Sequence, residues 1–432
     1  MNSLWSETVD IPGKEPLRHD MRTDVLIIGG GMAGVLCAWQ LKQAGVDYVL
    51  VEEQTLCSGI TKDTTAKITS QHGLIYDKLT NRFGLEGARK YLEANEAALE
   101  EYRGLCRDID CEFREADSVI YTMDRRDKIE KEVKALERIG CPAGFTTKTE
   151  LPFEVQGAVR VPGQAQFHPL KFVRALTPGL KVYEHTKVLE LAKGCAITDG
   201  GKITAKHMIV ATHFPLLNKH GSYFLKQYQH RSYVIAYENA RKVEGMYVDE
   251  SEKGLSFRSY GDLLLIGGGS HRTGKQGGSW QELSDFAARY YPDSRERYRW
   301  ATQDCMTLDD MPYIGQYSRH TPGLYVATGF HKWGMTSSMV AAGILRDAVI
   351  GRDNPYAELF SPSRSMLRPQ LAVNAFESAI HLLRPARKRC PHLGCALTWN
   401  RAEHSWDCAC HGSRFAKDGK LLNNPATDDL KG

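Results

Sequence analysis

Residues 24–34 read DVLIIGGGMAG, and this stretch decides the fold of the first part of the chain. The apolar run at 25–28 predicts a buried parallel strand, and the pattern Gly29-x-Gly31-x-x-Gly34 follows it directly. The next residues, VLCAWQLKQAG (35–45), carry apolar side chains at helical spacing and end at a glycine. A second apolar strand, YVLVEE (48–53), completes a strand–turn–helix–strand unit. The sequence therefore predicts a Rossmann-like α/β domain.

The three glycines and the helix after them suit a bound dinucleotide. Gly29 permits the tight turn, Gly31 lets the backbone approach a pyrophosphate, and Gly34 lets the helix pack close to the strand. The helix begins near Met32 and Ala33, where N–H groups and the positive end of the helix dipole favour phosphate. The alternative is a glycine turn in an α/β fold that binds nothing, and the complete unit argues against it.

The second strand and the segments after it indicate which dinucleotide is bound. Glu52 and Glu53 end this strand, where a carboxylate accepts hydrogen bonds from ribose hydroxyls and disfavours a 2′-phosphate. The following loop, CSGITKDTTAKIT (57–69), is rich in hydroxyl and small side chains and suits an extended dinucleotide. Two later strands, KHMIVAT (206–212) and one in PGLYVATGFHKWGMT (322–336) that runs into a glycine turn and a helix, favour FAD over NAD.

These segments resemble the glycine/D-amino-acid oxidase family of FAD-dependent oxidoreductases. The resemblance covers residues 20–355 and rests on DVLIIGGGMAG, VLVEE (49–53), LLLIGGGSHRTG (263–274), DDMPYIG (309–315) and LYVATGFHKWGMTSSMVAAGILRDAVIG (324–351). It implies a glutathione-reductase-like FAD fold with an inserted α+β substrate domain, and oxidation of an amine or amino acid with hydride transfer to the flavin. The loop SGITKDTTAKITSQHG (58–73) departs from the commoner family form, so contacts with phosphate there are inferred by position.

Positions in these motifs give the contacts expected with FAD. The turn after residues 324–327 is expected at the pyrimidine end of the flavin, where a helix dipole stabilises the charge that develops on reduction. Val188, in HTKVLEL (185–191), stands where the family's adenine-side strand contacts FAD through its backbone. The predicted cofactor-binding residues are Gly29, Gly31, Met32, Ala33, Gly34, Glu52, Glu53, Gly59, Ile60, Thr61, Thr65, Ala66, Lys67, Val188, Ala211, Thr212, Gly329, Gly334, Met335 and Thr336.

The domains are expected to be discontinuous along the chain. Amphipathic patterns at 85–106 and 127–139 predict helices, and strand-like segments between the FAD motifs suit an inserted cap. The predicted division is an FAD-binding domain at 20–80, 150–215 and 305–355, a substrate domain at 81–149 and 216–304, a linker and helix at 356–385, and a small tail at 386–432.

Few residues of the substrate domain indicate the reaction. Amine oxidation by hydride transfer requires a neutral amine and a well-placed C–H bond, and the sequence identifies no general base. The candidates for the catalytic site are His331 and Trp333, which flank the flavin-proximal turn, together with His72 and Arg272. For each of them, an ordinary packed or surface side chain is the alternative.

Composition limits the other classes of function. The chain has 56 Lys and Arg against 52 Asp and Glu, a net charge of +4 that does not by itself indicate a nucleic-acid partner. No apolar run approaches the ~20 residues of a membrane span. The N-terminus mixes charges throughout and shows no signal-peptide pattern. We therefore expect a cytoplasmic protein, in which disulfides are uncommon.

The tail carries two strings, CPHLGC (390–395) and CACHGS (408–413). Cys390-x-His392 and Cys408-x-x-His411 could bind zinc. However, a gap of one residue is shorter than the usual zinc spacing, and each string has a further cysteine that a tetrahedral site does not need. Zinc, an iron–sulfur cluster and a metal-free relic are therefore the three alternatives.

The two strings resemble the Rieske [2Fe-2S] domain, in which two cysteines bind one iron and two histidines bind the other. The tail after Pro385 is shorter than a whole Rieske domain, so we expect a shortened cluster-binding subdomain that leans on the flavoprotein body. The resemblance implies Cys390 and Cys408 on the inner iron, His392 and His411 on the outer iron, and a disulfide between Cys395 and Cys410.

Together these features predict an FAD-dependent dehydrogenase that acts on a small amine or amino-acid-like substrate. Its electrons would pass through a Rieske-type cluster to an unidentified one-electron acceptor. The cluster favours a dehydrogenase over an oxidase. An oxidase would need no cluster, because reduced flavin reacts with oxygen directly. The alternatives are reversed flow from cluster to flavin, a cluster that is a structural or redox-sensing element, and a non-oxidative or RNA-modifying use of the fold, against which the near-neutral charge argues.

Overall fold

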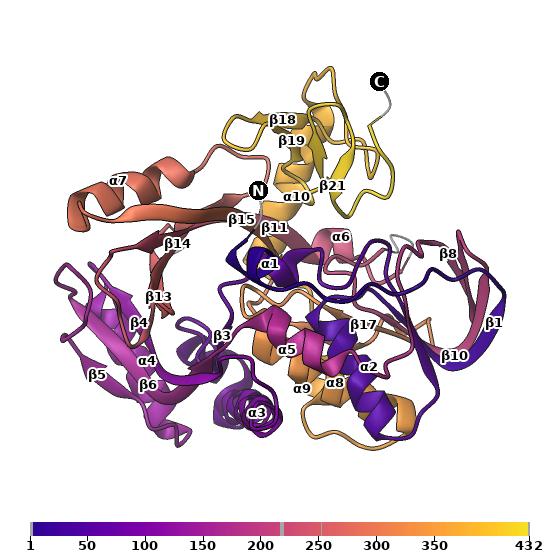
Figure 1. The fold of residues 1–432 in the computed structure, drawn as a ribbon, viewed down its shortest axis with the longest axis horizontal. Helices are drawn as coiled ribbons and strands as arrows, with labels where there is room; N and C mark the ends of the chain where they lie inside the picture. The colour runs from indigo at the N-terminus through magenta and orange to yellow at the C-terminus, as the bar shows by residue number, and fades with distance from the viewer. Residues whose placement is uncertain (1–2, 217–219, 252, 431–432) are drawn as a thin grey trace.

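Two large sheets lie side by side, and a small third sheet stands at the C-terminal end (Figure 1). A computed structural model describes residues 3–216, 220–251 and 253–430. Figure 1 shows the third sheet above the junction of the other two. None of the helices in these described ranges has the length and hydropathy of a membrane span.

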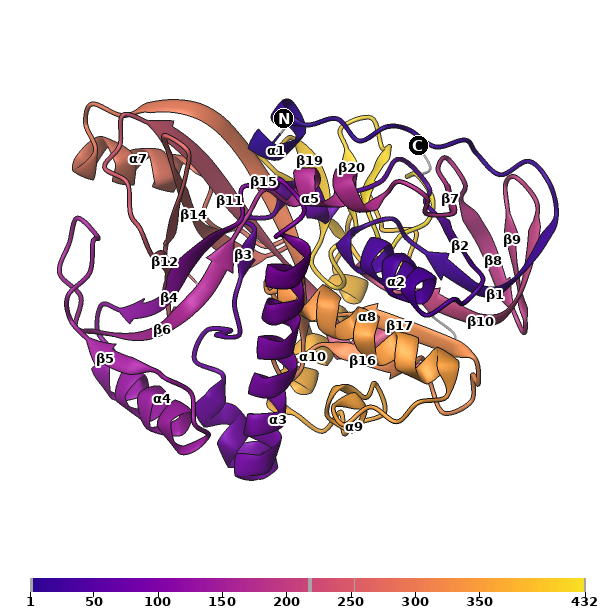
Figure 2. The same ribbon diagram turned by 60° about the horizontal axis from the view of Figure 1, so that its bottom comes forward.

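The first sheet is the predicted dinucleotide-binding sheet. Its core strands are parallel and almost fully buried, as their continuous apolar runs require. Helices α2 (Met32–Gln43) and α8 (Gly334–Ile350) pack side by side against it (Figure 2). In order, its strands are β16 (Tyr313–Gln316), β17 (Leu324–Thr328), β10 (Lys202–Val210), β1 (Met21–Ile28), β2 (Tyr48–Val51) and β7 (Val182–Tyr183), with β9 (Cys195–Thr198) paired to β10 and β8 (Val188–Ala192) paired to β9.

The second sheet belongs to the cap and is mostly antiparallel. The long helix α3 (Tyr76–Leu105) lies between the two sheets (Figure 2), and α4 (Arg126–Arg138) and α7 (Trp280–Tyr290) pack on the cap. In order, the strands are β15 (Arg295–Thr307), β11 (Gln227–Glu238), β14 (Leu263–Arg272), β13 (Ser256–Tyr260), β12 (Met246–Asp249), β4 (Arg114–Thr122), β6 (Gly157–Gln166) and β3 (Lys67–Ile68), with β5 (Gly144–Thr146) beside β6.

The cap takes two strands that the sequence assigned to the FAD-binding domain. β3 and β6 fall within the predicted ranges 20–80 and 150–215, but they pair with each other and β6 pairs with β4 in the second sheet. A short apolar run predicts a strand, whereas the sheet that it joins depends on long-range pairing. The sequence could therefore locate these strands and not their partners.

The third sheet is a small antiparallel meander. Its four strands are β18 (Leu397–Asn400), β19 (Ser405–Cys408), β20 (Arg414–Ala416) and β21 (Leu421–Asn423), and α10 (Pro369–Leu383) precedes it. Its core holds few residues, four of them cysteines, so it has little apolar area with which to stabilise itself alone. The remaining short helices are α1 (Leu4–Thr8), η1 (Ile60–Asp63), α5 (Pro169–Leu176), α6 (Tyr223–Lys226) and α9 (Ala357–Phe360).

Candidate functional site

A cavity of about 1180 Å³ runs along the carboxyl edge of the first sheet and reaches the cap strands β11, β14 and β15. The parallel strands β1, β2, β10 and β17 all end at this edge, which is where α/β sheets bind ligands. Every predicted cofactor-binding residue lines the cavity except Gly34, Ala66 and Thr336.

The three exceptions adjoin residues that line the cavity. A Cβ atom on Gly34 would come within 1.9 Å of the Gly29 carbonyl oxygen, so Gly34 lets the helix pack under the turn. Ala66 is fully buried. Thr336 donates its hydroxyl to the Thr69 carbonyl at 3.1 Å, and the same hydroxyl lies 3.0 Å from Nε2 of His72, which lines the cavity. These residues therefore shape the wall without forming it.

The glycine turn and the second strand have the geometry of a dinucleotide site. Gly29 has φ +107°, a conformation that favours glycine, and an added Cβ would meet the Ala211 carbonyl oxygen at 2.6 Å. The Glu52 carboxylate accepts from the N–H groups of Gly30 (2.6 Å) and Gln54 (2.9 Å), and burial raises its pKa. Glu53 instead pairs with Lys187 at 3.0 Å. Glu52 is thus the carboxylate fixed inside the fold.

The loop that departs from the family form is held by side chains from distant elements. Trp5 and Trp300 donate their indole N–H groups to the carbonyls of Thr64 (2.7 Å) and Asp63 (2.9 Å). Arg258, which is buried, donates to the Ala66 carbonyl at 2.9 Å. The sequence patterns gave no sign of these anchors, because each lies far away along the chain.

Lys67 belongs to the same loop and lines the cavity. Burial lowers the pKa of its ammonium to about 7, and the neighbouring Arg258 contributes in the same direction. An anionic ligand in the cavity would favour the charged form of an ammonium group whose pKa has been lowered in this way. Lys67 is therefore suited to a charged part of the cofactor.

The flavin-proximal turn carries two of the predicted catalytic residues. His331 and Lys332 both have positive φ (47° and 70°), so the turn is tightly wound without glycine at these positions. His331 Nε2 lies 3.4 Å from the Asp310 carboxylate. Trp333 stacks on His72 with ring centres 5.1 Å apart, and all three predicted residues line the cavity.

His72 is a supporting residue of the cavity wall. Its Nδ1 lies 2.7 Å from the Tyr91 hydroxyl, and its Nε2 lies 2.8 Å from the Thr69 carbonyl and 3.0 Å from Thr336 Oγ1. Burial lowers its pKa to about 3, so the ring stays neutral at physiological pH. A neutral, fully engaged imidazole fixes the Trp333 ring rather than exchanging protons with a substrate.

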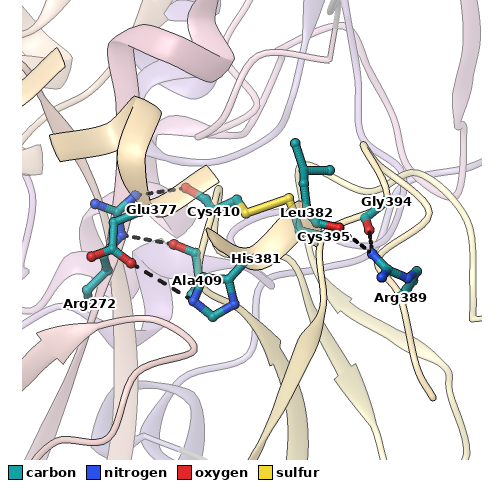
Figure 3. The surroundings of a disulfide bond; sticks show 9 residues. All are labelled: Arg272, Glu377, His381, Leu382, Arg389, Gly394, Cys395, Ala409 and Cys410. Atoms are coloured by element: carbon teal, nitrogen blue, oxygen red, sulfur yellow. Dashed lines mark hydrogen bonds and ion pairs between the residues drawn. A yellow bond between two sulfur atoms is a disulfide. The ribbon is translucent and has the colours of Figure 1, made fainter. Parts of the chain in front are cut away.

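Arg272 differs from the other predicted catalytic residues, because it faces the C-terminal sheet and is absent from the cavity lining. Its guanidinium donates to the carbonyls of Ala409 (2.9 Å) and Cys410 (3.1 Å) and to the side chain of Asn374 (3.0 Å), as Figure 3 shows for the first two. The predicted role of Arg272 in the flavin chemistry is therefore corrected: its side chain holds the tail. The motif could not reveal which way the last side chain of β14 points.

Three polar side chains that the sequence did not single out lie at the cap side of the cavity. Lys332 donates to the Ser270 hydroxyl at 2.6 Å. Burial raises the pKa of Asp304 to about 6, and Lys332 and Arg231 limit the rise. All three line the cavity. The feature of the sequence that could have indicated Asp304 is that it is a lone acid within the strand-like run RWATQDCMT (299–307).

Of the four predicted cluster ligands, the two cysteines lie together and the two histidines lie together. The thiol of Cys408 hydrogen-bonds that of Cys390 and lowers the Cys390 pKa to about 7. The rings of His392 and His411 are 4.9 Å apart and nearly perpendicular. Both ring nitrogens of His411 are buried and make no hydrogen bond among the described residues, so iron ligation would satisfy a group that is otherwise costly to bury.

A disulfide joins Cys395 and Cys410 beside these ligands (Figure 3). Donor atoms of Cys395, Cys408, Cys410 and His411 also lie within 4.8 Å of one another. Since the disulfide leaves no thiolate on Cys395 or Cys410, this group cannot be the ligand set. Two sulfurs on one side and two imidazoles on the other fit a Rieske cluster better than a single tetrahedral zinc.

Polar side chains of the cap hold the cluster loops in place. Gln229 Nε2 donates to the carbonyls of His411 (2.8 Å) and Asn424 (3.0 Å), and Gln303 Nε2 donates to that of Gly412 (2.8 Å). A Cβ on Gly412 would lie 2.5 Å from Gln229 Cβ, so the loop touches β11 directly. Strands of the cap therefore support the cluster loops of a subdomain that has few core residues of its own.

A buried charge cluster crosses the same interface. Glu403 of the tail binds Arg231 of β11 through two hydrogen bonds of 2.8 and 2.5 Å, and Arg414 lies 2.8 Å from the same carboxylate. All three side chains are buried. Burial alone would raise the pKa of Glu403, but Arg231 and Arg414 hold it at about 2.

The histidine side of the cluster site faces the body of the protein. His411 is only 2% exposed and meets the ring of Phe224 edge-on, and His392 meets Phe214. Asn424 donates to the carbonyl of Thr212 at 2.6 Å, and Thr212 lines the flavin cavity. The tail therefore forms part of the wall around the flavin.

Comparison with known proteins agrees with both sites. The family model of the FAD-dependent oxidoreductases (DAO) matches residues 24–348, and that of the Rieske [2Fe-2S] domain matches residues 370–432. The chain is 34% identical to the Rieske 2Fe-2S iron-sulfur protein YhfW of Bacillus subtilis (strain 168), over 99% of this chain and 97% of that protein. The tail is 45% identical over 42 residues to the cytochrome b6-f complex iron-sulfur subunit of Synechococcus sp. (strain JA-3-3Ab), which is 10% of this chain and 24% of that subunit.

Solved structures share the fold of the flavoprotein body. Glycine oxidase from Geobacillus kaustophilus superposes with a TM-score of 0.66 at 22% identity, covering 80% of this chain and 99% of that one. L-proline dehydrogenase from P. horikoshii gives 0.67 at 16% identity, covering 81% and 98%. The chain belongs to the DAO family of FAD-dependent oxidoreductases and carries a Rieske [2Fe-2S] domain in its C-terminal part.

Proposed function

We propose that this protein is a dehydrogenase that oxidises a small amine or amino-acid-like substrate and passes the two electrons, one at a time, to an external one-electron acceptor. FAD supplies hydride acceptance from the substrate carbon, and the Rieske cluster supplies single-electron transfer. The observation that carries the proposal is the direction of the cluster site, whose histidine pair faces the body while Asn424 binds Thr212 at the flavin cavity.

The substrate class is supported by the polar end of the cavity. Amine oxidation needs the neutral amine, and Asp304, with a pKa of about 6, is ionised at neutral pH and can take the proton from an ammonium group. Ser270 and Lys332 stand beside it as hydrogen-bonding groups. Glycine oxidase, L-proline dehydrogenase and an L-amino acid deaminase from Proteus vulgaris share the fold, which supports the same class.

The substrate class is tested by mixing the protein with a panel of amines and amino acids without oxygen and following flavin absorbance. At least one C–N donor is expected to bleach the flavin, with a second-order rate at least about tenfold above that of a matched alcohol. If every C–N donor fails while dithionite bleaches the flavin, the amine assignment is wrong.

The role of Asp304 is tested by the pH dependence of the same reaction. Below its pKa of about 6 the carboxyl is protonated and cannot accept a proton, so the bleaching rate should fall about tenfold per pH unit on the acid side. Asp304→Asn should lower the rate by about 10²-fold and remove this acid limb. An unchanged profile in the variant would exclude Asp304 as the proton acceptor.

A further inference from the structure

Helix α10 presents its apolar face to solvent. Phe376 is 65% exposed and Leu383 is 83% exposed, and exposed Val373 and Ile380 complete a series at helical spacing with them. Ala372, Ala375 and Ala379 on the same part of the helix are also exposed. A continuous apolar surface of this kind on a folded protein marks a site of interaction.

The polar side chains of α10 are the ones that face the protein. Asn374 is buried, accepts from Arg272 and donates to the Leu225 carbonyl at 3.3 Å. Glu377 pairs with Lys275, and His381 is buried. The helix is therefore fixed through its polar side, and its amphipathic pattern is inverted relative to that of an ordinary surface helix.

The charged residues of the segment that contains α10 are almost all basic. Residues 366–394 contain a single acid, Glu377, and it is already paired with Lys275. The basic residues of this segment stand at the two ends of the helix and are Arg368, Arg384, Arg387, Lys388 and Arg389. The face thus has an apolar centre and cationic ends.

These charges discriminate between possible occupants. A second copy of the chain would bring the cationic ends of two helices together in either a parallel or an antiparallel pair, and like charges at close range disfavour the contact. A specific protein partner is usually recognised through hydrogen bonds as well as apolar contacts, but the exposed face carries only Val, Phe, Ile, Leu and Ala side chains. A lipid surface requires no such hydrogen bonds, and anionic headgroups attract the arginines.

We propose that α10 attaches the protein to the surface of an anionic lipid bilayer. Phe376, Ile380 and Leu383 enter the boundary between headgroups and acyl chains, and the arginines at the ends of the helix contact the headgroups. The cluster loop lies at the C-terminal end of α10, where Arg389 donates to the Leu382 and Gly394 carbonyls. The attachment thus places the cluster site at the bilayer surface, and it does not depend on the proposed dehydrogenase activity.

The test is co-sedimentation of the full-length, cofactor-loaded protein with vesicles made of phosphatidylcholine and phosphatidylglycerol in equal parts, or of phosphatidylcholine alone. The protein should pellet with the anionic vesicles and bind the neutral ones at least about tenfold more weakly. Equal binding to both vesicles would overturn the proposed charge contact.

Two variants and a matched control locate the contact. Phe376→Ser/Leu383→Ser and Arg384→Glu/Arg387→Glu should each reduce partitioning by at least about tenfold, while flavin absorbance and far-UV circular dichroism stay unchanged because these side chains are exposed. Leu189→Ser, at a 60% exposed leucine of β8, should bind as the wild type does. Binding that survives both α10 variants, or falls equally in the control, would overturn the proposal.

Sedimentation velocity without lipid tests the alternative occupant of this face, which is a second copy of the chain. A monomer that binds anionic vesicles supports the proposal. Absence of vesicle binding would overturn it, whether the protein is monomeric or forms a dimer that Phe376→Ser/Leu383→Ser dissociates, and the second result would assign α10 to contact between copies of the chain.

Discussion

The flavin cavity is lined by residues at the carboxyl ends of four parallel strands, whereas the cluster ligands stand on two loops of a small sheet with few core residues. In the first region the glycine turn and the strand ends are fixed by their own sheet, while the loop at 57–69 also accepts hydrogen bonds from Trp5, Trp300 and Arg258. In the second, the fixing groups belong to the neighbouring cap, through Gln229, Gln303, Arg231 and Arg272. A shortened metal-binding domain can therefore obtain from polar side chains of another domain the support that its own small core does not provide.

The largest effect on this comparison is expected from Glu403→Gln. The substitution leaves Arg231 buried without its carboxylate, which costs about 3–5 kcal/mol, whereas Arg414 keeps its bond to Asp407. Hydrogen exchange of residues 390–413 should accelerate, and iron should be lost more readily. Glu244→Gln, which breaks an exposed pair with Arg114, should cost less than about 1 kcal/mol. Equal protection in both variants would show that the cluster region supports itself.

Low pH should weaken the attachment of the tail to the cap, because it protonates Glu403. The folded pKa of Glu403 is about 2, below the value of about 4.3 for an unfolded glutamate. Its contribution is therefore complete above about pH 5 and is lost as the pH falls through the folded pKa, a change of about 3 kcal/mol. Tryptophan fluorescence and visible absorbance of the cluster measure the release. Glu403→Gln should remove the glutamate-dependent part, and an identical acid transition in that variant would contradict this account.

A smaller effect is expected from Gln229→Ala. The substitution removes the donor to the His411 and Asn424 carbonyls and costs about 1–3 kcal/mol. The temperature at which cluster absorbance is lost should fall, while flavin absorbance persists. Gln281→Ala serves as the control, since Gln281 is exposed and its side chain donates to Asp285 of the same helix. A fall of the same size in both variants would argue against support of the loop by β11.

The smallest effect is expected in the flavin region from Glu52→Gln. The neutral side chain accepts more weakly from Gly30 and Gln54 and is a poorer partner for a ribose. FAD affinity should fall about tenfold, which is ~1.4 kcal/mol, whereas Glu53→Gln should change it little. Titration of the apoflavoprotein with FAD measures this. Loss of iron in Glu52→Gln would show that the two regions are not separable.

The sequence predicted the flavin region more completely than the cluster region. The βαβ unit, with Gly29, Gly31 and Glu52, has local spacing that follows from the turn and the helix, so the motif and the structure agree. The four predicted cluster ligands and the disulfide cysteines likewise stand in local strings, and the structure brings each predicted pair together.

What the sequence could not show depends on contacts between distant segments. Arg272 points to the tail and not to the flavin, Trp5 and Arg258 anchor the loop at 60–66, and Asp304 reaches the cavity from the middle of a strand. None of these follows from periodicity or spacing. The direction of the apolar face of α10 was equally hidden, because the pattern is the same for a helix that faces a core and for one that faces solvent.

Reduction of the cluster by flavin within one chain is tested most directly by anaerobic freeze-quench EPR, after the fully loaded protein is mixed with an amine that bleaches the flavin. The expected result is a reduced-cluster signal that rises as flavin absorbance falls, at a rate independent of protein concentration. Bleaching of the flavin without that signal, in a sample where dithionite does produce it, would contradict the proposed path.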